Sequence, residues 1–266
     1  MPDPQTSTFT ASVTLAHGDV VSLAWAGVTH VGMRREVNQD AFLTEYPLFA
    51  VADGMGGHIG GEIASASTVN RLASMVSAGK VSTAEIEKSL VKAVKDIVAH
   101  PETTDEGTGT TLTGVFLDTS GPESWVTFNV GDSRVYLLRG GSFEQITTDH
   151  SVVQELIAAG RLSPEEAENH PYGNVITKAV GPSDRVVPDY VRLDIVDGDR
   201  FVICSDGLTK ELTDYGIGHF LAEHEDPAAA VDAMLAASLE NGGRDNVTVV
   251  VLDVARAGAD SSPAQP

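Results

Sequence analysis

Short apolar runs bounded by glycine or polar residues recur along the chain, and each predicts a buried β-strand. The clearest runs cover residues 48–52, 125–130, 200–204 and 247–254. A run of this length between turn residues is typical of a strand that is covered on both faces. The pattern predicts further strands at 10–16, 22–29, 41–46, 107–118, 135–139, 142–147 and 191–195.

Apolar residues at helical spacing predict helices between some of these strands. One helix is expected over 62–76 and another over 86–98, preceded by a capping box that starts at Ser82. Asp226 and Pro227 begin a last helix. Because helices and strands do not alternate strictly, the pattern favours an α+β fold.

Residues 151–181 interrupt the succession of strands with short helical stretches. The sequence predicts one helix over 151–159 and a second one after a capping box formed by Ser163 and Glu166. An insertion of this kind suggests a flap over a functional site. A surface connection without a role is the alternative.

Composition narrows the class of protein. The 266 residues carry a formal charge of −21, which argues against nucleic acid or an anionic membrane surface as a partner. Cys204 is the single cysteine, so the chain has no internal disulfide. The N-terminus lacks the basic and apolar regions of a signal peptide, and no segment reaches the roughly 18 apolar residues of a membrane span. We therefore expect a cytoplasmic protein, and we take it to be a monomer.

Aspartates stand at the ends of several predicted strands. Asp53 ends the first clear run and is followed by several glycines, whereas Asp132, Asp206 and Asp245 lie next to the other three runs. Asp40 precedes the strand at 41–46. Five such junctions in one chain predict a single site that is assembled from several strand ends.

Converging carboxylates repel one another, so this pattern predicts a divalent cation that neutralises them. Oxygen ligands favour Mg²⁺, Mn²⁺ or Ca²⁺ over Zn²⁺. A carboxylate shared by two ions would hold them about 3.5–4 Å apart, and such a pair promotes displacement at phosphorus. Arg35 could bind two oxygens of a phosphate with its planar guanidinium. A surface salt bridge is the alternative for Arg35.

Other catalytic chemistries fit the sequence less well. Cys204 is followed by Lys210 and not by the arginine of a Cys-x5-Arg phosphatase motif, and its place at the end of an apolar run predicts a buried core thiol. The Gly-x-Ser-x-Gly run of a serine hydrolase does not occur. The charge of −21 disfavours an Asp-rich nuclease.

Seven short motifs stand in the order that one known family shows. They are Arg35-x2-Asn38-Gln39-Asp40, Ala52-Asp53-Gly54-Met55-Gly56-Gly57-His58, Gly109-Thr110-Thr111, Gly131-Asp132-Ser133-Arg134, Asp149-His150-Ser151, Ser205-Asp206-Gly207 and Asp245-Asn246. With these motifs the chain, from about residue 22 to 254, resembles the metal-dependent protein phosphatases (type 2C, or PPM) in their bacterial branch. The resemblance implies a four-layer α-β-β-α sandwich of two antiparallel sheets flanked by helices, with two or three Mn²⁺ or Mg²⁺ ions at one end. Residues 1–21 would then form a partly loose N-terminal extension, and 255–266 a disordered tail.

The resemblance also implies a set of metal ligands. Asp53 would bridge two ions, and the carbonyl group of Gly54 would bind the second of them. Asp206 and Asp245 would complete the first ion's coordination.

Further residues take roles from the same resemblance. Asp40 and Gln39 would act mainly through metal-bound waters, and Asp132 matches the position of a ligand to a third ion. Arg35 would hold the substrate phosphate. The segment 151–181 matches the family's flap.

The implied reaction is the hydrolysis of phosphoserine or phosphothreonine in proteins by a metal-bound hydroxide, in opposition to Ser/Thr protein kinases. The eukaryotic branch has a histidine two residues after the bridging aspartate, where this chain has Met55. His58 is a candidate for the general acid. Two alternatives are a phosphatase dedicated to one regulator, such as an anti-sigma-factor antagonist, and an inactive binding module of the same fold. Arg35 argues against a dedicated phosphatase, and the full set of acidic positions argues against an inactive binding module.

Overall fold

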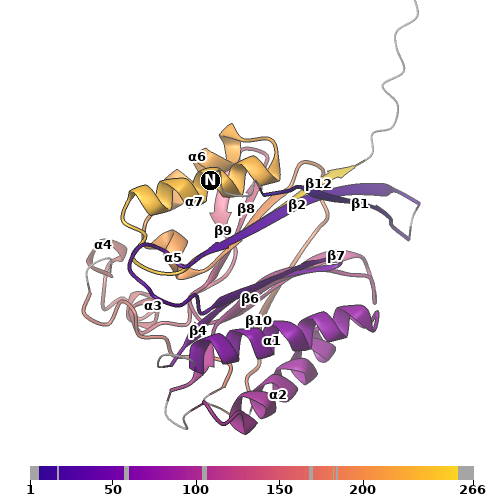
Figure 1. Ribbon diagram of the computed structural model, residues 1–266. Coiled ribbons are helices and arrows are strands. Elements are labelled where there is room, and N and C mark those ends of the chain that lie inside the picture. The colour runs from indigo at the N-terminus through magenta and orange to yellow at the C-terminus, as the bar shows by residue number, and fades with distance from the viewer. Residues whose placement is uncertain are drawn as a thin grey trace, which may run out of the picture.

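Two antiparallel sheets pack face to face in the computed structural model (Figure 1). The structure describes residues 6–16, 18–56, 60–103, 107–167, 170–181, 183 and 185–256. The first sheet has the strand order β1-β2-β12-β11-β8-β9. Its strands are β1 (Phe9–Thr14), β2 (Val20–His30), β8 (Arg134–Arg139), β9 (Ser142–Gln145), β11 (Arg200–Cys204) and β12 (Val247–Arg256). The second sheet has the order β10-β7-β6-β4-β3, and β5 pairs with β4 beside this path. Its strands are β3 (Asp40–Glu45), β4 (Leu48–Met55), β5 (Gly109–Thr110), β6 (Leu112–Asp118), β7 (Ser124–Val130) and β10 (Asp189–Leu193).

The apolar runs become strands that are buried on both faces. In β4, Phe49 and Val51 belong to the core between the two sheets, whereas Leu48, Ala50 and Ala52 belong to the core under the helices. Successive side chains of a strand point to opposite faces, so a strand that is covered on both sides must be apolar throughout. The continuous runs in the sequence have this origin.

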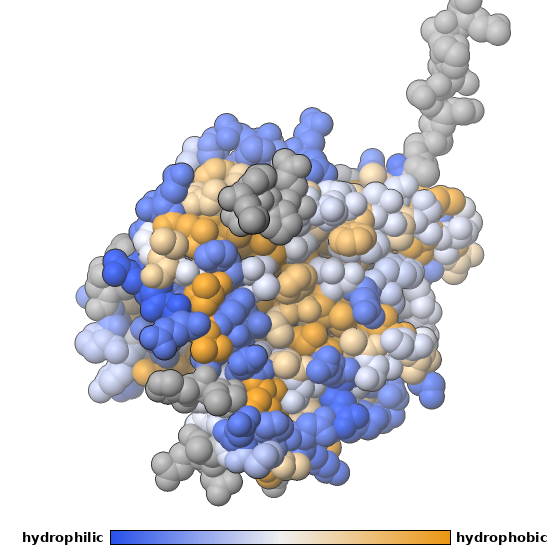
Figure 2. Space-filling view, viewed as in Figure 1, coloured by the Kyte–Doolittle hydropathy of each residue, from blue (hydrophilic) through white to orange (hydrophobic). Residues whose placement is uncertain are grey.

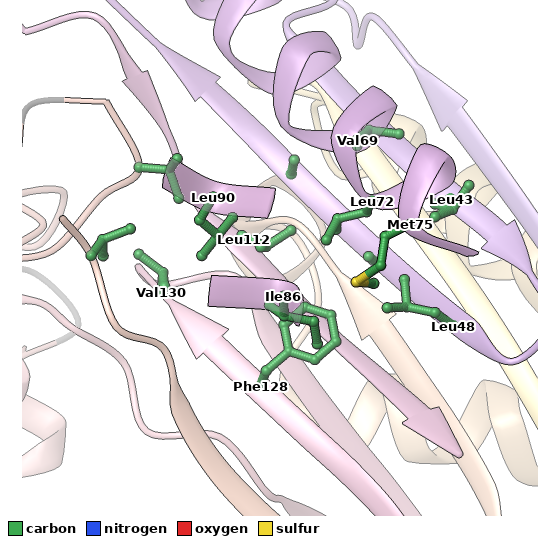
Figure 3. Close-up of a cluster of buried hydrophobic side chains, with 14 of the residues drawn as sticks. Leu43, Leu48, Val69, Leu72, Met75, Ile86, Leu90, Leu112, Phe128 and Val130 are labelled. Carbon is green, nitrogen blue, oxygen red and sulfur yellow. The ribbon is translucent and has the colours of Figure 1, made fainter. Parts of the chain in front are cut away.

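Helices α1 (Gly60–Ser77) and α2 (Thr83–Ala99) cover the outer face of the second sheet (Figure 1). Figure 3 shows Leu72 of α1 and Ile86 of α2 turned toward the strands, with Ile86 beside Phe128. These side chains form a continuous apolar layer, which fixes both helices against the sheet.

The outer face of the first sheet is covered by α6 (Asp214–Glu223), α7 (Pro227–Glu240) and the single-turn α5 (Asp206–Thr209). Leu221 of α6 and Val231 of α7 are fully buried there. The order of layers is therefore helix, sheet, sheet, helix, and the predicted fold class is confirmed.

The segment 151–181 contains two short helices, α3 (Val152–Ala158) and α4 (Pro164–Ala167). The predicted capping box at α4 is present, because the Ser163 hydroxyl accepts a hydrogen bond from the Glu166 N–H and the Glu166 carboxylate accepts one from the Ser163 N–H. The predicted interruption of the strand succession is confirmed.

Helix α6 is an element that the apolar pattern did not predict. It contains Gly216 and Gly218, which lower helix propensity. Its buried side chains are Ile217 and Leu221 alone, so its apolar stripe is too narrow to stand out in the sequence.

The structure describes part of the two predicted end segments, 1–21 and 255–266. Strand β1 lies within the predicted N-terminal extension, yet it pairs with β2 from Phe9 opposite Trp25 to Thr14 opposite Val20. The first sheet therefore begins inside residues 1–21. Most of the predicted tail at 255–266 falls outside the described residues.

Among the helices that the structure describes, none is long and apolar enough to cross a membrane.

The close approach of β4 and β6 yields a test of the packing. A Cβ on Gly114 would overlap the Phe49 carbonyl oxygen and lie 2.5 Å from the ring of Phe128. We expect Gly114→Ala to lower the free energy of unfolding by about 1–3 kcal/mol or more, because neither strand can move aside. Gly121 has no atom within 4 Å of such a Cβ, so Gly121→Ala should stay within about 0.5 kcal/mol. Urea denaturation compares the two variants, and equal effects would contradict the packing described here.

Candidate active site

The aspartates at the strand ends meet at one end of the sandwich. Asp53 lies near the end of β4, and Asp206 begins α5 directly after β11. Asp132 lies in the turn between β7 and β8, and Asp245 lies just before β12. All four line one open cleft of about 710 Å³. The two sheets thus contribute to a single site.

The cleft is bordered by charged and polar segments. Figure 2 shows hydrophilic residues gathered at the left of the view, at the end where Figure 1 labels α3, α4 and α5. Arg35, from the loop between β2 and β3, lines the cleft. Asn174 and Ile176 also line it, so the segment 151–181 borders the cleft.

Asp40 and Asp53 are directly opposite each other across β3 and β4. The Oδ2 atom of Asp40 accepts hydrogen bonds from Ser205 Oγ (2.8 Å) and Thr248 Oγ1 (2.7 Å). Its Oδ1 atom is buried and has no hydrogen-bond partner among the described residues. Because like charges on opposite strands destabilise a sheet, this pair of carboxylates requires a proton or a cation.

Burial and mutual repulsion raise the pKa values of these carboxyl groups. Burial is the largest cause that raises the pKa of Asp40 to about 7, although two hydroxyl hydrogen bonds offset part of its effect. Burial, followed by the charge of Asp206, raises the pKa of Asp132 to about 7. Burial, followed by the charge of Asp40, raises the pKa of Asp53 well above its ordinary value. A cation bound among these groups would favour their ionised forms.

Asp206 and Asp245 have basic partners. Lys210 Nζ lies 2.5 Å from Asp206 Oδ2 and 2.9 Å from Asp245 Oδ2. Arg35 contacts both oxygens of Asp245, with Nε 2.8 Å from Oδ1 and Nη2 3.0 Å from Oδ2. Burial raises the pKa of Asp245, but the hydrogen bonds and charges of Lys210 and Arg35 bring that pKa below its ordinary value.

Thr110, in β5, and Thr111, between β5 and β6, fix the backbone of Asp53. The Asp53 N–H donates to Thr111 Oγ1 (3.0 Å), and the Thr111 N–H donates to the Asp53 carbonyl oxygen (2.8 Å). Thr110 Oγ1 donates to the same carbonyl oxygen (2.9 Å). At the next residue, a Cβ on Gly54 would overlap the Gly61 carbonyl oxygen. Glycine is therefore required at position 54, the residue whose carbonyl group would be a metal ligand according to the family resemblance.

Asn246 ties the loop that carries Arg35 to the start of β12. Its Nδ2 donates to the carbonyl oxygens of Val31 (2.9 Å) and Val37 (3.0 Å), and its Oδ1 accepts from the Gln39 N–H (2.8 Å). The sequence analysis placed Asn246 in a motif without a role, because these partners lie far from it along the chain. The motif that contains Asn246 was the signal from which a structural role for this residue could have been predicted.

The residues present fit a hard divalent cation. The acidic side chains of the cleft offer carboxylate oxygens, the ligand type that Mg²⁺ and Mn²⁺ prefer. Asp206 Oδ1, like Asp40 Oδ1, is a buried oxygen without a hydrogen-bond partner in the described part of the chain. Within the described ranges, no three His, Cys, Asp or Glu side chains are already gathered as a ligand cluster. Asp245 instead faces Arg35 and Lys210 in this arrangement.

Two further candidates from the sequence have different outcomes. Cys204 is fully buried, and burial raises the pKa of its thiol to about 12, so the prediction of a core thiol is confirmed. His58, the candidate general acid, lies outside the described residues. Lys210 is a charged residue of the cleft to which the sequence analysis gave no role.

Comparisons with known proteins agree with the motifs. The profile of the protein phosphatase 2C family matches residues 27–242. The serine/threonine protein phosphatase PstP of Mycobacterium tuberculosis is 37% identical over 236 residues, which are 87% of this chain and 45% of PstP. The chain thus spans about half the length of PstP. The protein phosphatase PhpP of Streptococcus pneumoniae is 32% identical over 247 residues, which are 85% of this chain and 96% of PhpP.

Solved structures show the same likeness. The crystal structure of the PstP catalytic domain in complex with two manganese ions superposes with a TM-score of 0.78 at 32% identity, over 88% of this chain and 99% of that domain. The resemblance inferred from the seven motifs is confirmed. Sequence and structure agree over most of the domain, and the chain belongs to the protein phosphatase 2C family of metal-dependent protein phosphatases.

Proposed function

We propose that this chain hydrolyses phosphoserine and phosphothreonine in proteins at a site that holds two or three Mn²⁺ or Mg²⁺ ions. The family uses these metals. The observation that carries the proposal is one cleft where Asp53, Asp132, Asp206 and Asp245 meet beside Arg35. Its substrates would be proteins phosphorylated by a Ser/Thr kinase. A monomer suffices for this activity, because every proposed ligand comes from one chain.

The metal ligands would be divided between the two sheets. Asp53 and the carbonyl group of Gly54 would contribute from β4, and Asp206 and Asp245 would contribute from the ends of β11 and β12. Asp132 would serve a further ion near Asp206. The buried Oδ1 of Asp206, which has no hydrogen-bond partner in the described ranges, supports this division, because an ion would supply the bond that it lacks.

Asp40 would contact the ions through a bound water and not directly. Its Oδ2 accepts hydrogen bonds from Ser205 and Thr248. Its Oδ1, which has no partner within the described part of the chain, would accept a hydrogen bond from a water of the metal site. When bound, the ions would lower the pKa of a water so that it attacks phosphorus, and they would neutralise charge on the phosphate.

Arg35 would orient the substrate phosphate. Its side chain is 52% exposed and reaches from the rim of the cleft to Asp245. A planar guanidinium can exchange a carboxylate for a phosphate without a change in binding geometry, because both offer two oxygens. Asn246 supports this role because it holds the loop on which Arg35 lies.

Loss of a metal ligand should remove activity without loss of the fold. We expect Asp206→Asn to lower kcat on a phosphothreonine peptide by about a hundredfold or more, because metal ions supply several kcal/mol of stabilisation to such reactions. Activity of the unchanged chain should require Mn²⁺ or Mg²⁺ and should vanish in EDTA. Asp19→Asn is the matched control, since Asp19 is 59% exposed and pairs with Arg256 away from the cleft. Full activity of Asp206→Asn, or activity of the unchanged chain in EDTA, would contradict the proposal.

The raised pKa values of Asp40 and Asp132 predict how stability depends on pH without metal. Each group has a pKa of about 7 in the folded chain and about 3.9 in the unfolded chain. Their contribution to stability is therefore full below the unfolded pKa and is lost as the pH rises through about 7. In EDTA, the free energy of unfolding should fall by on the order of 1–3 kcal/mol from pH 6 to pH 8.

Saturating Mn²⁺ should abolish or reverse this fall, because the cation favours the ionised carboxylates. Urea denaturation at each pH, with EDTA or with Mn²⁺, measures both dependences. A stability in EDTA that rises over this pH range would show that the buried carboxyl groups do not titrate as described.

A further inference from the structure

Lys210 forms ion pairs with Asp206 and Asp245, two of the carboxylates that would bind the proposed metal ions. It is the C-cap residue of α5 and stands four residues after Asp206, so its side chain folds back over the first residue of that turn. Its ammonium group bridges Asp206 Oδ2 and Asp245 Oδ2 at 2.5 and 2.9 Å. The side chain is 29% exposed, which leaves this ion pair partly shielded from solvent.

These contacts leave few oxygens free for an ion that Asp206 and Asp245 would share. Both oxygens of Asp245 have basic partners, since Arg35 contacts each of them and Lys210 contacts Oδ2. Asp206 keeps a single oxygen, Oδ1, without a hydrogen-bond partner among the residues that the structure describes. An ion that binds either carboxylate through Oδ2 must therefore displace the ammonium group of Lys210, and an ion at the Oδ1 atoms would still lie close to that positive charge.

We infer that Lys210 is an internal cation that competes with the divalent ion for Asp206 and Asp245, and so sets how tightly this chain binds its metal. The inference rests on the metal site assigned under the proposed function. Lys210 stabilises the metal-free site, because it neutralises carboxylates that would otherwise repel one another. It opposes the metal-bound site twice, since its ion pairs must break and its positive charge stays near a dication.

Removal of the charge at position 210 should therefore destabilise the chain without metal and should stabilise the chain with bound metal. Lys210→Met should bind Mn²⁺ about ten- to a hundredfold more tightly than the unchanged chain, the range expected for the loss of a charge-assisted hydrogen bond that competes with the ion. In EDTA, the same variant should unfold at a lower temperature than the unchanged chain. In saturating Mn²⁺ it should unfold at the same temperature or a higher one.

The measurements are calorimetric titration with Mn²⁺ and thermal unfolding in EDTA and in Mn²⁺. Lys210→Gln is a second neutral variant for the case that the methionine does not fold. Lys210→Arg keeps the charge, so its Kd for Mn²⁺ should be no lower than that of the unchanged chain. A residue with a purely structural role would lower the unfolding temperature equally in both conditions.

Lys178→Met is the matched control. Lys178 is 28% exposed, and its Nζ lies 2.7 Å from Asp189 Oδ1, so it resembles Lys210 in exposure and in having a carboxylate partner. Asp189 is not a proposed metal ligand. This variant should leave the Kd for Mn²⁺ unchanged.

Failure of the inference can be told apart from failure of the proposed function. If the unchanged chain binds no Mn²⁺, the proposed metal site itself is wrong. If it binds Mn²⁺ with the same Kd as both neutral variants, the competition is refuted and the metal site stands. Equal tightening by Lys178→Met would also refute the inference, because the effect would then follow net charge alone.

Discussion

The structure depends on the placement of two carboxylates directly opposite each other in a buried part of a sheet. Asp40 and Asp53 are partners across β3 and β4, and burial raises the pKa of Asp40 to about 7. A sheet tolerates such a pair when protons or cations neutralise it. The site thus requires positive charge near its carboxylates. Lys210 and Arg35 supply part of it through their ion pairs with the neighbouring Asp245.

The remaining architecture holds this charged group in place. Thr110 and Thr111 fix the backbone of Asp53, and hydroxyl groups from β12 and the end of β11 bind Asp40. Asn246 connects the arginine-bearing loop to the first sheet. These contacts join both sheets at one end of the sandwich, so the packing of the apolar layers and the geometry of the site are coupled. Rigid support of this kind is what a reaction at a positioned phosphate needs.

Much of this arrangement could be predicted from the sequence, because its signals are local. The apolar run of β4 and the aspartate that ends it are adjacent in the chain, and a motif carries both. The register that pairs Asp40 with Asp53 depends on the turn between the strands and leaves no local pattern. Helix α6 escaped prediction because glycines interrupt a narrow apolar stripe. The ion pair between Lys210 and Asp245 was not predicted, because the two residues lie 35 positions apart in the sequence.

The most direct test of the account is titration calorimetry of the metal-free protein with Mn²⁺ at pH 7, in two buffers of different ionisation enthalpy. Carboxyl groups with pKa values of about 7, such as those of Asp40 and Asp132, are partly protonated at this pH. The account therefore predicts that at least two ions bind and that at least about one proton is released per chain, because the pKa of the Asp53 carboxyl group is raised as well. Absence of Mn²⁺ binding, or binding without release of protons, would contradict the claim that a cation neutralises this buried group of aspartates.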